Sequence, residues 1–193
     1  TRLQGDWSSD VCSSDLVRLE PLRKLYKLDK LSDEDMVNFQ RLNLLDASAP
    51  NPSVETLFHA FLPHKFIDHT HANAVLAVSD QANGEDLLRE VYNGRCAVVE
   101  YVMPGFSLAK MASEAQKKMP KAEGLVLHKH GIFTWGDTAE EAYHRMIEFV
   151  SLAEQRLAKG RRNVFAPGAL PRARYLVPSS CCHLASSSVS RSR

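Results

Sequence analysis

The sequence lacks most of the features that would quickly assign it to a class of protein. In a chain of 193 residues, 24 Lys and Arg nearly balance 23 Asp and Glu, so no electrostatic field that would attract nucleic acid is expected. No apolar run is long enough to span a membrane, and the polar, serine-rich start has no apolar centre of a secretory signal. We therefore expect neither nucleic acid nor a membrane as a partner.

The cysteines form no recognisable framework, and the common catalytic motifs are absent. The four cysteines show no metal-site spacing, and two of them are adjacent, which makes a poor disulfide framework: Cys12, Cys96, Cys181 and Cys182. No P-loop, dinucleotide fingerprint or Ser-His-Asp order is present. A chain of this length can form one domain with a real core, and we expect a cytoplasmic location.

Both ends differ in composition from the middle of the chain. Residues 1–16 have no periodicity, and from Asp6 to Leu16 they resemble the conceptual translation of a common DNA-sequencing adapter. We interpret them as an artefact, the alternative being a natural disordered tail. Arg and Ser dominate residues 171–193, as in a disordered or frameshifted tail. Neither Trp7 nor Leu176 should be buried, and the domain should occupy residues 17–170.

Hydrophobic periodicity predicts alternating helices and strands in this domain. Helices are expected after the capping residue Ser32 to about residue 45, and at 53–61, 72–78, 84–92, 106–119 and 138–159. The last of these should bury Ala142, Met146, Phe149 and Leu152. Strands are expected at 66–71, 96–102, 124–130 and 132–135. This alternation indicates the α/β class.

Two pairs of histidines favour a metal site. His69 and His71 are two residues apart on an expected strand and so share a face. A third imidazole would complete the three-nitrogen set typical of a catalytic zinc with an open position. His128 and His130 repeat the pattern on another expected strand, and chemistry alone does not choose between them. One such pair is more often a surface or hydrogen-bonded group, but two pairs favour the metal interpretation.

Glu55 and Tyr101 are the candidates for proton transfer. Glu55 is expected in the first turn of a helix, where the dipole favours its ionised form, and a carboxylate beside a metal can act as acid or base. It could also be a helix-terminal acid worth only roughly 0.3–1 kcal/mol. Tyr101 ends an expected strand and is either a core or rim tyrosine or a proton donor near a pocket.

The remaining candidate residues are assigned to packing or to the surface. We interpret His59 and His64 as polar packing groups or as partners of metal ligands. His144, on the longest expected helix, should lie on a solvated or interface face. Lys129 should point away from the two neighbouring histidines, which makes a Schiff-base role weak.

Four segments resemble the class II aldolase/adducin family: Pro52–Glu55, Asp68–His71, Tyr101–Gly105 and His130–Gly131. From Val17 to about Leu157, the chain is similar to the aldolase half of bifunctional rhamnulose-1-phosphate aldolase/short-chain dehydrogenase proteins. The resemblance implies a three-layer α/β/α fold around a central, mostly antiparallel sheet. It also implies assembly as a homotetramer.

The resemblance further implies a site and a reaction. Zinc, or another divalent metal, would be held by His69, His71 and His130, with Glu55 as the acid/base and Tyr101 as a proton donor. The implied reaction is aldol cleavage of a ketose 1-phosphate, with L-rhamnulose 1-phosphate giving dihydroxyacetone phosphate and lactaldehyde. The alternatives are another metal-dependent sugar-phosphate reaction, such as epimerisation or dehydration, or a non-catalytic interaction domain like that of adducins.

The chain also departs from the family's pattern. The Gly-Asn-Ser/Thr segment and the Gly-rich loop that hold the substrate phosphate have no counterpart, and the adapter-like string occupies their place. The 193 residues also contain no counterpart of the dehydrogenase half. We therefore expect a truncated domain with a nearly complete metal site, an uncovered sheet edge and almost no aldolase activity when made as it stands.

Overall fold

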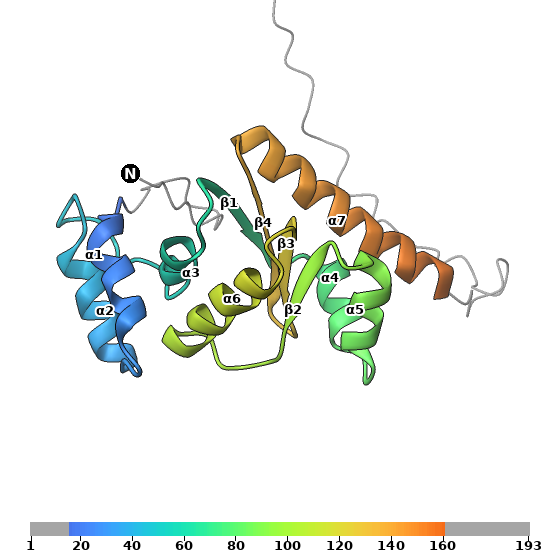
Figure 1. Cartoon of the computed structure of the whole chain (residues 1–193), viewed down its shortest axis with the longest axis horizontal. Helices are drawn as coiled ribbons and strands as arrows, with labels where there is room; N and C mark the ends of the chain where they lie inside the picture. The colour runs from blue at the N-terminus through green and yellow to red at the C-terminus, as the bar shows by residue number, and fades with distance from the viewer. Residues whose placement is uncertain (1–15, 161–193) are drawn as a thin grey trace, which may run out of the picture. The chain divides into compact units, whose positions relative to one another are not determined.

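The computed structural model describes residues 16–160. In chain order the elements are α1 (Leu19–Lys24), η1 (Leu25–Lys27), α2 (Asp33–Leu42), α3 (Thr56–Phe61), β1 (Phe66–Thr70), α4 (Asn73–Ser79), α5 (Gly84–Tyr92), β2 (Cys96–Val99), α6 (Phe106–Lys118), β3 (Gly124–Leu127), β4 (Gly131–Gly136) and α7 (Ala139–Gly160) (Figure 1). Of the described helices, none combines the length and apolarity needed to cross a membrane.

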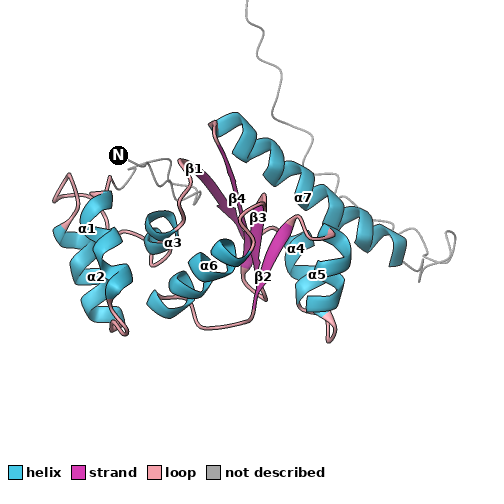
Figure 2. Ribbon diagram, in the orientation of Figure 1, coloured by secondary structure: helices cyan, strands magenta, loops and turns pink. Residues whose placement is uncertain are grey.

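The four described strands form one mixed sheet in the order β1-β4-β3-β2 (Figure 2). The β1–β4 and β4–β3 pairs are antiparallel, and only β2 and β3 run parallel. In this register His69 on β1 lies opposite Phe133 on β4. The α/β class expected from the pattern of elements and the mostly antiparallel sheet implied by the resemblance are confirmed.

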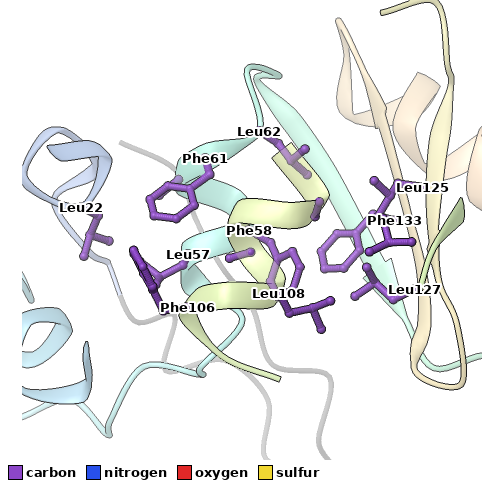
Figure 3. Packing of buried hydrophobic residues seen from close by; sticks show 14 of the residues in the cluster. Leu22, Leu57, Phe58, Phe61, Leu62, Phe106, Leu108, Leu125, Leu127 and Phe133 are labelled. Atoms are coloured by element: carbon purple, nitrogen blue, oxygen red, sulfur yellow. The ribbon is translucent and has the colours of Figure 1, made fainter. Parts of the chain in front are cut away.

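Helices cover both faces of this sheet, because successive strand residues point to opposite sides. Leu125, Leu127 and Phe133 join one apolar core, which α1, α3 and α6 complete (Figure 3). Val126 and Ile132, from the alternate positions, join a second core built with α4, α5 and α7. The sheet is therefore the middle layer of three, as the resemblance implied.

The strands that carry the histidines are shorter than the periodicity predicts. β1 ends at Thr70, one residue before His71. β3 ends at Leu127, and His128 to His130 form a turn in which Lys129 has a positive φ of 59°. His128 and His130 therefore do not share the face of a strand, and that expectation is wrong. β2 likewise ends at Val99 rather than near residue 102.

The helix boundaries follow their capping residues. Ser32 caps α2 by accepting a hydrogen bond from the Asp35 N–H (3.1 Å), as expected, although α2 ends at Leu42 rather than Leu45. α5 occupies the predicted residues and closes on Asn93 in the left-handed conformation. In α7, Ala153 is buried in place of Leu152, which is only half-buried. The buried position is thus one residue later than predicted, about 100° further around the helix axis.

The predicted tails fall almost wholly outside the described residues, and so do Trp7 and Leu176. Leu16 is the exception. Its carbonyl accepts a hydrogen bond from the Leu45 N–H (2.8 Å), and the next residue, Val17, is buried and bridges Leu44. Leu16 thus belongs with the folded domain rather than with the preceding segment.

Candidate metal centre

Four side chains from three separate segments converge on one point. The Oε1 atom of Glu55 lies 2.9 Å from Nε2 of His130, 3.2 Å from Nε2 of His69 and 3.3 Å from Nε2 of His71. The Nε2 atoms of His69 and His71 are 3.0 Å apart. All four ligating atoms lie within 4.8 Å of one another.

The local fold explains why these side chains meet. His69 is near the end of β1 and His71 follows it, whereas His130 stands in the turn between β3 and the neighbouring strand β4. Gly131 allows the close approach: a methyl group there would lie 2.6 Å from the Thr70 carbonyl oxygen and within 3.0 Å of the imidazoles of His69 and His71. Position 131, where the start of β4 lies against the end of β1, therefore requires glycine.

Glu55 enters the cluster from the start of α3. It occupies the N-cap position rather than the first turn of the helix, which corrects the sequence-based placement. The Glu55 N–H donates a hydrogen bond to the hydroxyl oxygen of Ser53 (3.2 Å), which shapes the turn before the helix. The side chain still lies at the positive end of α3, where an anion is favoured.

His69 is held in one orientation by its surroundings. Its Nδ1–H donates to the carbonyl oxygen of Ile132 (3.0 Å), which turns Nε2 toward the cluster. The ring stacks on Phe133, with centroids 3.9 Å apart and planes 10° from parallel. The sequence offers no signal for this arrangement, because the acceptor is a backbone carbonyl.

The cluster is buried on one side and open on the other. The His130 and His69 side chains are 8% and 9% exposed and Glu55 is 19% exposed, whereas His71 is 55% exposed. A substrate would therefore approach from the side of His71.

The electrostatics of the cluster favour a cation. Burial opposes ionisation of Glu55, but hydrogen bonds from His130 and then His69 outweigh burial and hold the pKa of this carboxyl well below its usual range. Burial, followed by repulsion from His69, lowers the pKa of His71. A metal ion that displaced the Nε2 protons would meet one carboxylate oxygen and three imidazole nitrogens directed at the same point.

This donor set fits a divalent metal. Three imidazole nitrogens with one carboxylate oxygen are typical zinc ligands, and a tetrahedral ion with bonds of about 2.0–2.1 Å separates its donors by about 3.3–3.4 Å. The Glu55–imidazole separations of 2.9–3.3 Å lie close to that spacing. Without an ion, the two neighbouring Nε2 lone pairs of His69 and His71 would repel each other unless a proton lay between them.

Comparison with known proteins agrees with this geometry. Residues 21–157 match the family described as "Class II Aldolase and Adducin N-terminal domain". The chain belongs to the class II aldolase and adducin family. All four clustered residues lie within the matched range.

Two relatives share 41% identity with this class II aldolase/adducin chain. One is the "Uncharacterized oxidoreductase YuxG" of Bacillus subtilis, matched over 139 residues, which are 72% of this chain and 20% of that protein. The other is the N-terminal class II aldolase domain of a conserved Thermoplasma acidophilum protein, whose structure gives a TM-score of 0.66 over 73% of this chain and 65% of that chain. This chain therefore spans less than two thirds of either relative.

A more distant structure shares the fold alone. The sugar-phosphate aldolase of Thermotoga maritima is 22% identical, with a TM-score of 0.50 over 62% of this chain and 60% of that chain.

Tyr101 and His128 lie outside the class II aldolase/adducin cluster. Tyr101 is exposed after β2, and its hydroxyl contacts the sulfur of Met103 (3.3 Å); among the described residues no hydrogen bond joins it to the cluster. His128 turns to the start of α5, where its Nε2 would lie 3.1 Å from a methyl group placed on Gly84. The structure thus brings His130, not His128, to Glu55.

The other histidines occupy packing or surface positions. His59 makes an edge contact with Phe133, and His64 stacks on Trp135 with centroids 4.5 Å apart. His144 is exposed on α7 beside Glu140, as predicted. Lys129 is exposed in the β3–β4 turn, and its backbone has a positive φ of 59°.

Proposed function

We propose that this domain is the metal-dependent catalytic part of an aldolase that cleaves a sugar phosphate. The observation that carries the proposal is the convergence of His69, His71 and His130 on Oε1 of Glu55 within 3.3 Å. Family membership supports the same reaction class. The three imidazoles would hold the ion, and zinc is the metal we propose, because three protein ligands of this kind with an open fourth position are typical of catalytic zinc.

Glu55 is the proposed acid/base. In the cleavage direction a proton leaves the carbon-4 hydroxyl, the bond between carbons 3 and 4 breaks, and its electron pair goes to carbon 3. The aldehyde departs, and a proton must be delivered to carbon 3. Glu55, beside the open side of the cluster, would deliver that proton. When bound, the metal would act as a Lewis acid on the ketose oxygens.

Tyr101 is the weaker of the two proton-transfer assignments. We keep it as the candidate group for the departing aldehyde oxygen, on the strength of the family resemblance. Its contact with Met103 and its exposure mean that this role would need the side chain to turn toward the substrate.

The proposed substrate is a ketose 1-phosphate, L-rhamnulose 1-phosphate, which would give dihydroxyacetone phosphate and lactaldehyde. The support for this choice is the resemblance stated from the sequence, between residues 17–157 and the aldolase half of rhamnulose-1-phosphate aldolase/short-chain dehydrogenase proteins. We also propose a homotetramer in the cytoplasm, and a catalytic domain at residues 17–170 of a longer protein. The small share of the Bacillus subtilis relative that this chain covers agrees with a longer protein.

A second enzymatic candidate is epimerisation or dehydration of a sugar phosphate at the same metal. A non-catalytic adducin-like role is disfavoured, because an interaction domain has no need for Glu55 and three histidines with converging lone pairs. Zinc binding separates the enzymatic proposals from the non-catalytic one.

The first test is metal content. Equilibrium dialysis of the chain against zinc should give one ion per chain. His71→Ala and His130→Ala should each abolish tight binding, while His144→Ala, which removes an exposed imidazole on α7, should not. Equal binding in all three variants would contradict the proposed ligand set.

The second test is turnover. The full-length protein should release dihydroxyacetone phosphate from L-rhamnulose 1-phosphate, whereas the 193-residue chain should be nearly inactive, since binding energy from a remote phosphate is needed for turnover as well as for affinity. A full-length, zinc-loaded protein that epimerises or dehydrates the sugar instead would favour the second candidate. Equal activity of the two forms would show that this chain needs no further phosphate site.

A further inference from the structure

We propose that Ser79 is a positioning residue for the metal centre: its hydroxyl holds the β3–β4 turn in the conformation that aims His130 at the site. The inference rests on the proposed metal-binding function and adds to it a residue outside the ligand set.

The direction of His130 depends on an unfavourable backbone conformation. The turn is closed by a hydrogen bond from the His130 N–H to the Leu127 carbonyl (3.0 Å). Lys129, between them, has a φ of 59°, in the left-handed region that residues with a Cβ rarely occupy. A lysine stays there only if its surroundings hold it.

Ser79 supplies that restraint. The Lys129 N–H donates a short hydrogen bond to the Ser79 hydroxyl oxygen (2.5 Å), and Ser79 is fully buried. If Lys129 returned to the right-handed or extended region, its N–H would leave this acceptor. A buried donor without a partner is costly. The hydroxyl therefore selects the left-handed turn.

The position of Ser79 in the fold ties two ligand segments together. Ser79 is the last residue of α4, and α4 begins two residues after His71. The short helix thus connects the end of β1, which bears His71, to the turn that bears His130. The hydrogen bond from Lys129 to Ser79 completes this connection between the two segments. Neither Ser79 nor Lys129 is a proposed metal ligand.

Gly84, the first residue of α5, fixes Ser79 from its other side. A methyl group at Gly84 would lie 2.0 Å from the Ser79 carbonyl oxygen, 2.7 Å from its carbonyl carbon and 3.1 Å from Nε2 of His128. The start of α5 therefore packs directly on the backbone of Ser79 and beside the first residue of the turn. Ser79 has little freedom to shift away from Lys129.

The experiment compares two buried serines. Ser79→Ala removes the acceptor of the Lys129 N–H. Ser113→Ala is the matched control: Ser113 is also buried, and its hydroxyl donates to the Phe61 carbonyl (3.2 Å) in the core around α6. Zinc affinity is measured by competition with a chromophoric chelator, the cobalt-loaded absorption spectrum reports ligand geometry, and urea unfolding of the metal-free protein reports stability.

Ser79→Ala should weaken zinc binding by about 10–100-fold, the range for residues that orient metal ligands, and should change the cobalt spectrum. Ser113→Ala should leave both unchanged even where it lowers stability to the same extent. If Ser79→Ala does not fold, Ser79→Cys takes its place with the same expected loss, because sulfur fills the space but accepts hydrogen bonds only weakly.

A double substitution tests the route through the backbone. Glycine adopts the left-handed conformation freely, so Ser79→Ala should cost less zinc affinity in a Lys129→Gly background than in the natural one. Equal losses in both backgrounds would overturn the proposal, as would natural affinity in Ser79→Ala. If the unsubstituted chain binds no zinc, the proposed function itself fails and takes this assignment with it.

Discussion

The histidine cluster and the apolar core behind it meet at the ring of Phe133, but different interactions hold the two regions together. One face of Phe133 stacks on His69 at 3.9 Å, and the ring also stacks on Phe58 at 4.9 Å. On the core side, many weak contacts between buried side chains stabilise the fold (Figure 3). On the cluster side, four polar side chains direct their nitrogen and oxygen atoms at one point, which suits them to hold a cation rather than to pack.

This difference predicts that substitutions on the two sides of the ring change different quantities. Core substitutions should lower the free energy of unfolding, because they leave cavities. Cluster substitutions should lower metal affinity or turnover while the metal-free domain stays folded. The predictions below test that division, from the largest expected effect to the smallest.

Removing the shared ring should have the largest effect. Phe133→Ala should lower the free energy of unfolding by about 3–5 kcal/mol, the usual cost of truncating a buried aromatic residue, because Phe133 is fully buried. It should also loosen His69 and weaken zinc binding. Urea unfolding with and without zinc measures both. A loss of zinc affinity with an unchanged free energy of unfolding would contradict the assignment of Phe133 to the core.

Glu55→Gln should spare the fold and remove the chemistry. The amide is nearly isosteric but cannot exchange the proton, so turnover in the full-length protein should fall by about 10²–10⁴-fold, the typical contribution of an acid/base group. Zinc content and urea unfolding should stay near the natural values. Glu154→Gln, at an exposed position of α7, is the control. Natural turnover in Glu55→Gln would remove Glu55 from the mechanism.

Gly131→Ala should affect both sides moderately. The added methyl group would meet the Thr70 carbonyl at 2.6 Å and the imidazoles of His69 and His71 within 3.0 Å, so β1 and β4 must separate. Overpacking of this kind costs about 1–3 kcal/mol, and zinc affinity should fall with it. The comparison would fail if this variant bound zinc as tightly as the natural chain.

The smallest effect is expected far from the cluster. Arg95, just before β2, forms a two-pronged ion pair with Glu148 on α7, at 2.5 and 3.0 Å. The hydrogen bond from Arg95 lowers the pKa of Glu148. This contribution should be complete above pH of about 4.3, the unfolded glutamate value, and should be lost as the pH falls below it.

Glu148→Gln should therefore cost about 1 kcal/mol or less at neutral pH, and the difference from the natural protein should shrink under acid conditions. Urea unfolding across a pH series measures this difference. A difference in unfolding free energy that grew as the pH fell would contradict the lowered pKa of Glu148. Zinc affinity should not change at neutral pH.

The elements could be predicted from the sequence because they follow local rules. α5 has its predicted limits, since Asn93 accepts the left-handed conformation that ends a helix. The nearness of His69 and His71 was also expected from their spacing of two residues, although β1 ends at Thr70, before His71. Both arguments need only neighbouring residues.

The third proposed ligand, His130, could not be predicted from the residues alone. Periodicity placed His128 and His130 on one strand face, but Lys129 turns the chain in between. The conformation of Lys129 depends on Ser79, fifty positions earlier in the chain, and no local rule detects such a contact. Only the family resemblance chose His130, and the structure then brought that residue to Glu55.

The most direct test of the central claim is X-ray absorption at the zinc edge of the loaded chain. The account predicts a first shell of about four nitrogen and oxygen neighbours near ~2.0–2.1 Å, with outer-shell scattering from three imidazoles. His130→Ala should lose one imidazole, and His144→Ala should lose none. A shell of oxygen atoms without imidazole scattering would contradict the assignment of His69, His71 and His130 as the metal ligands.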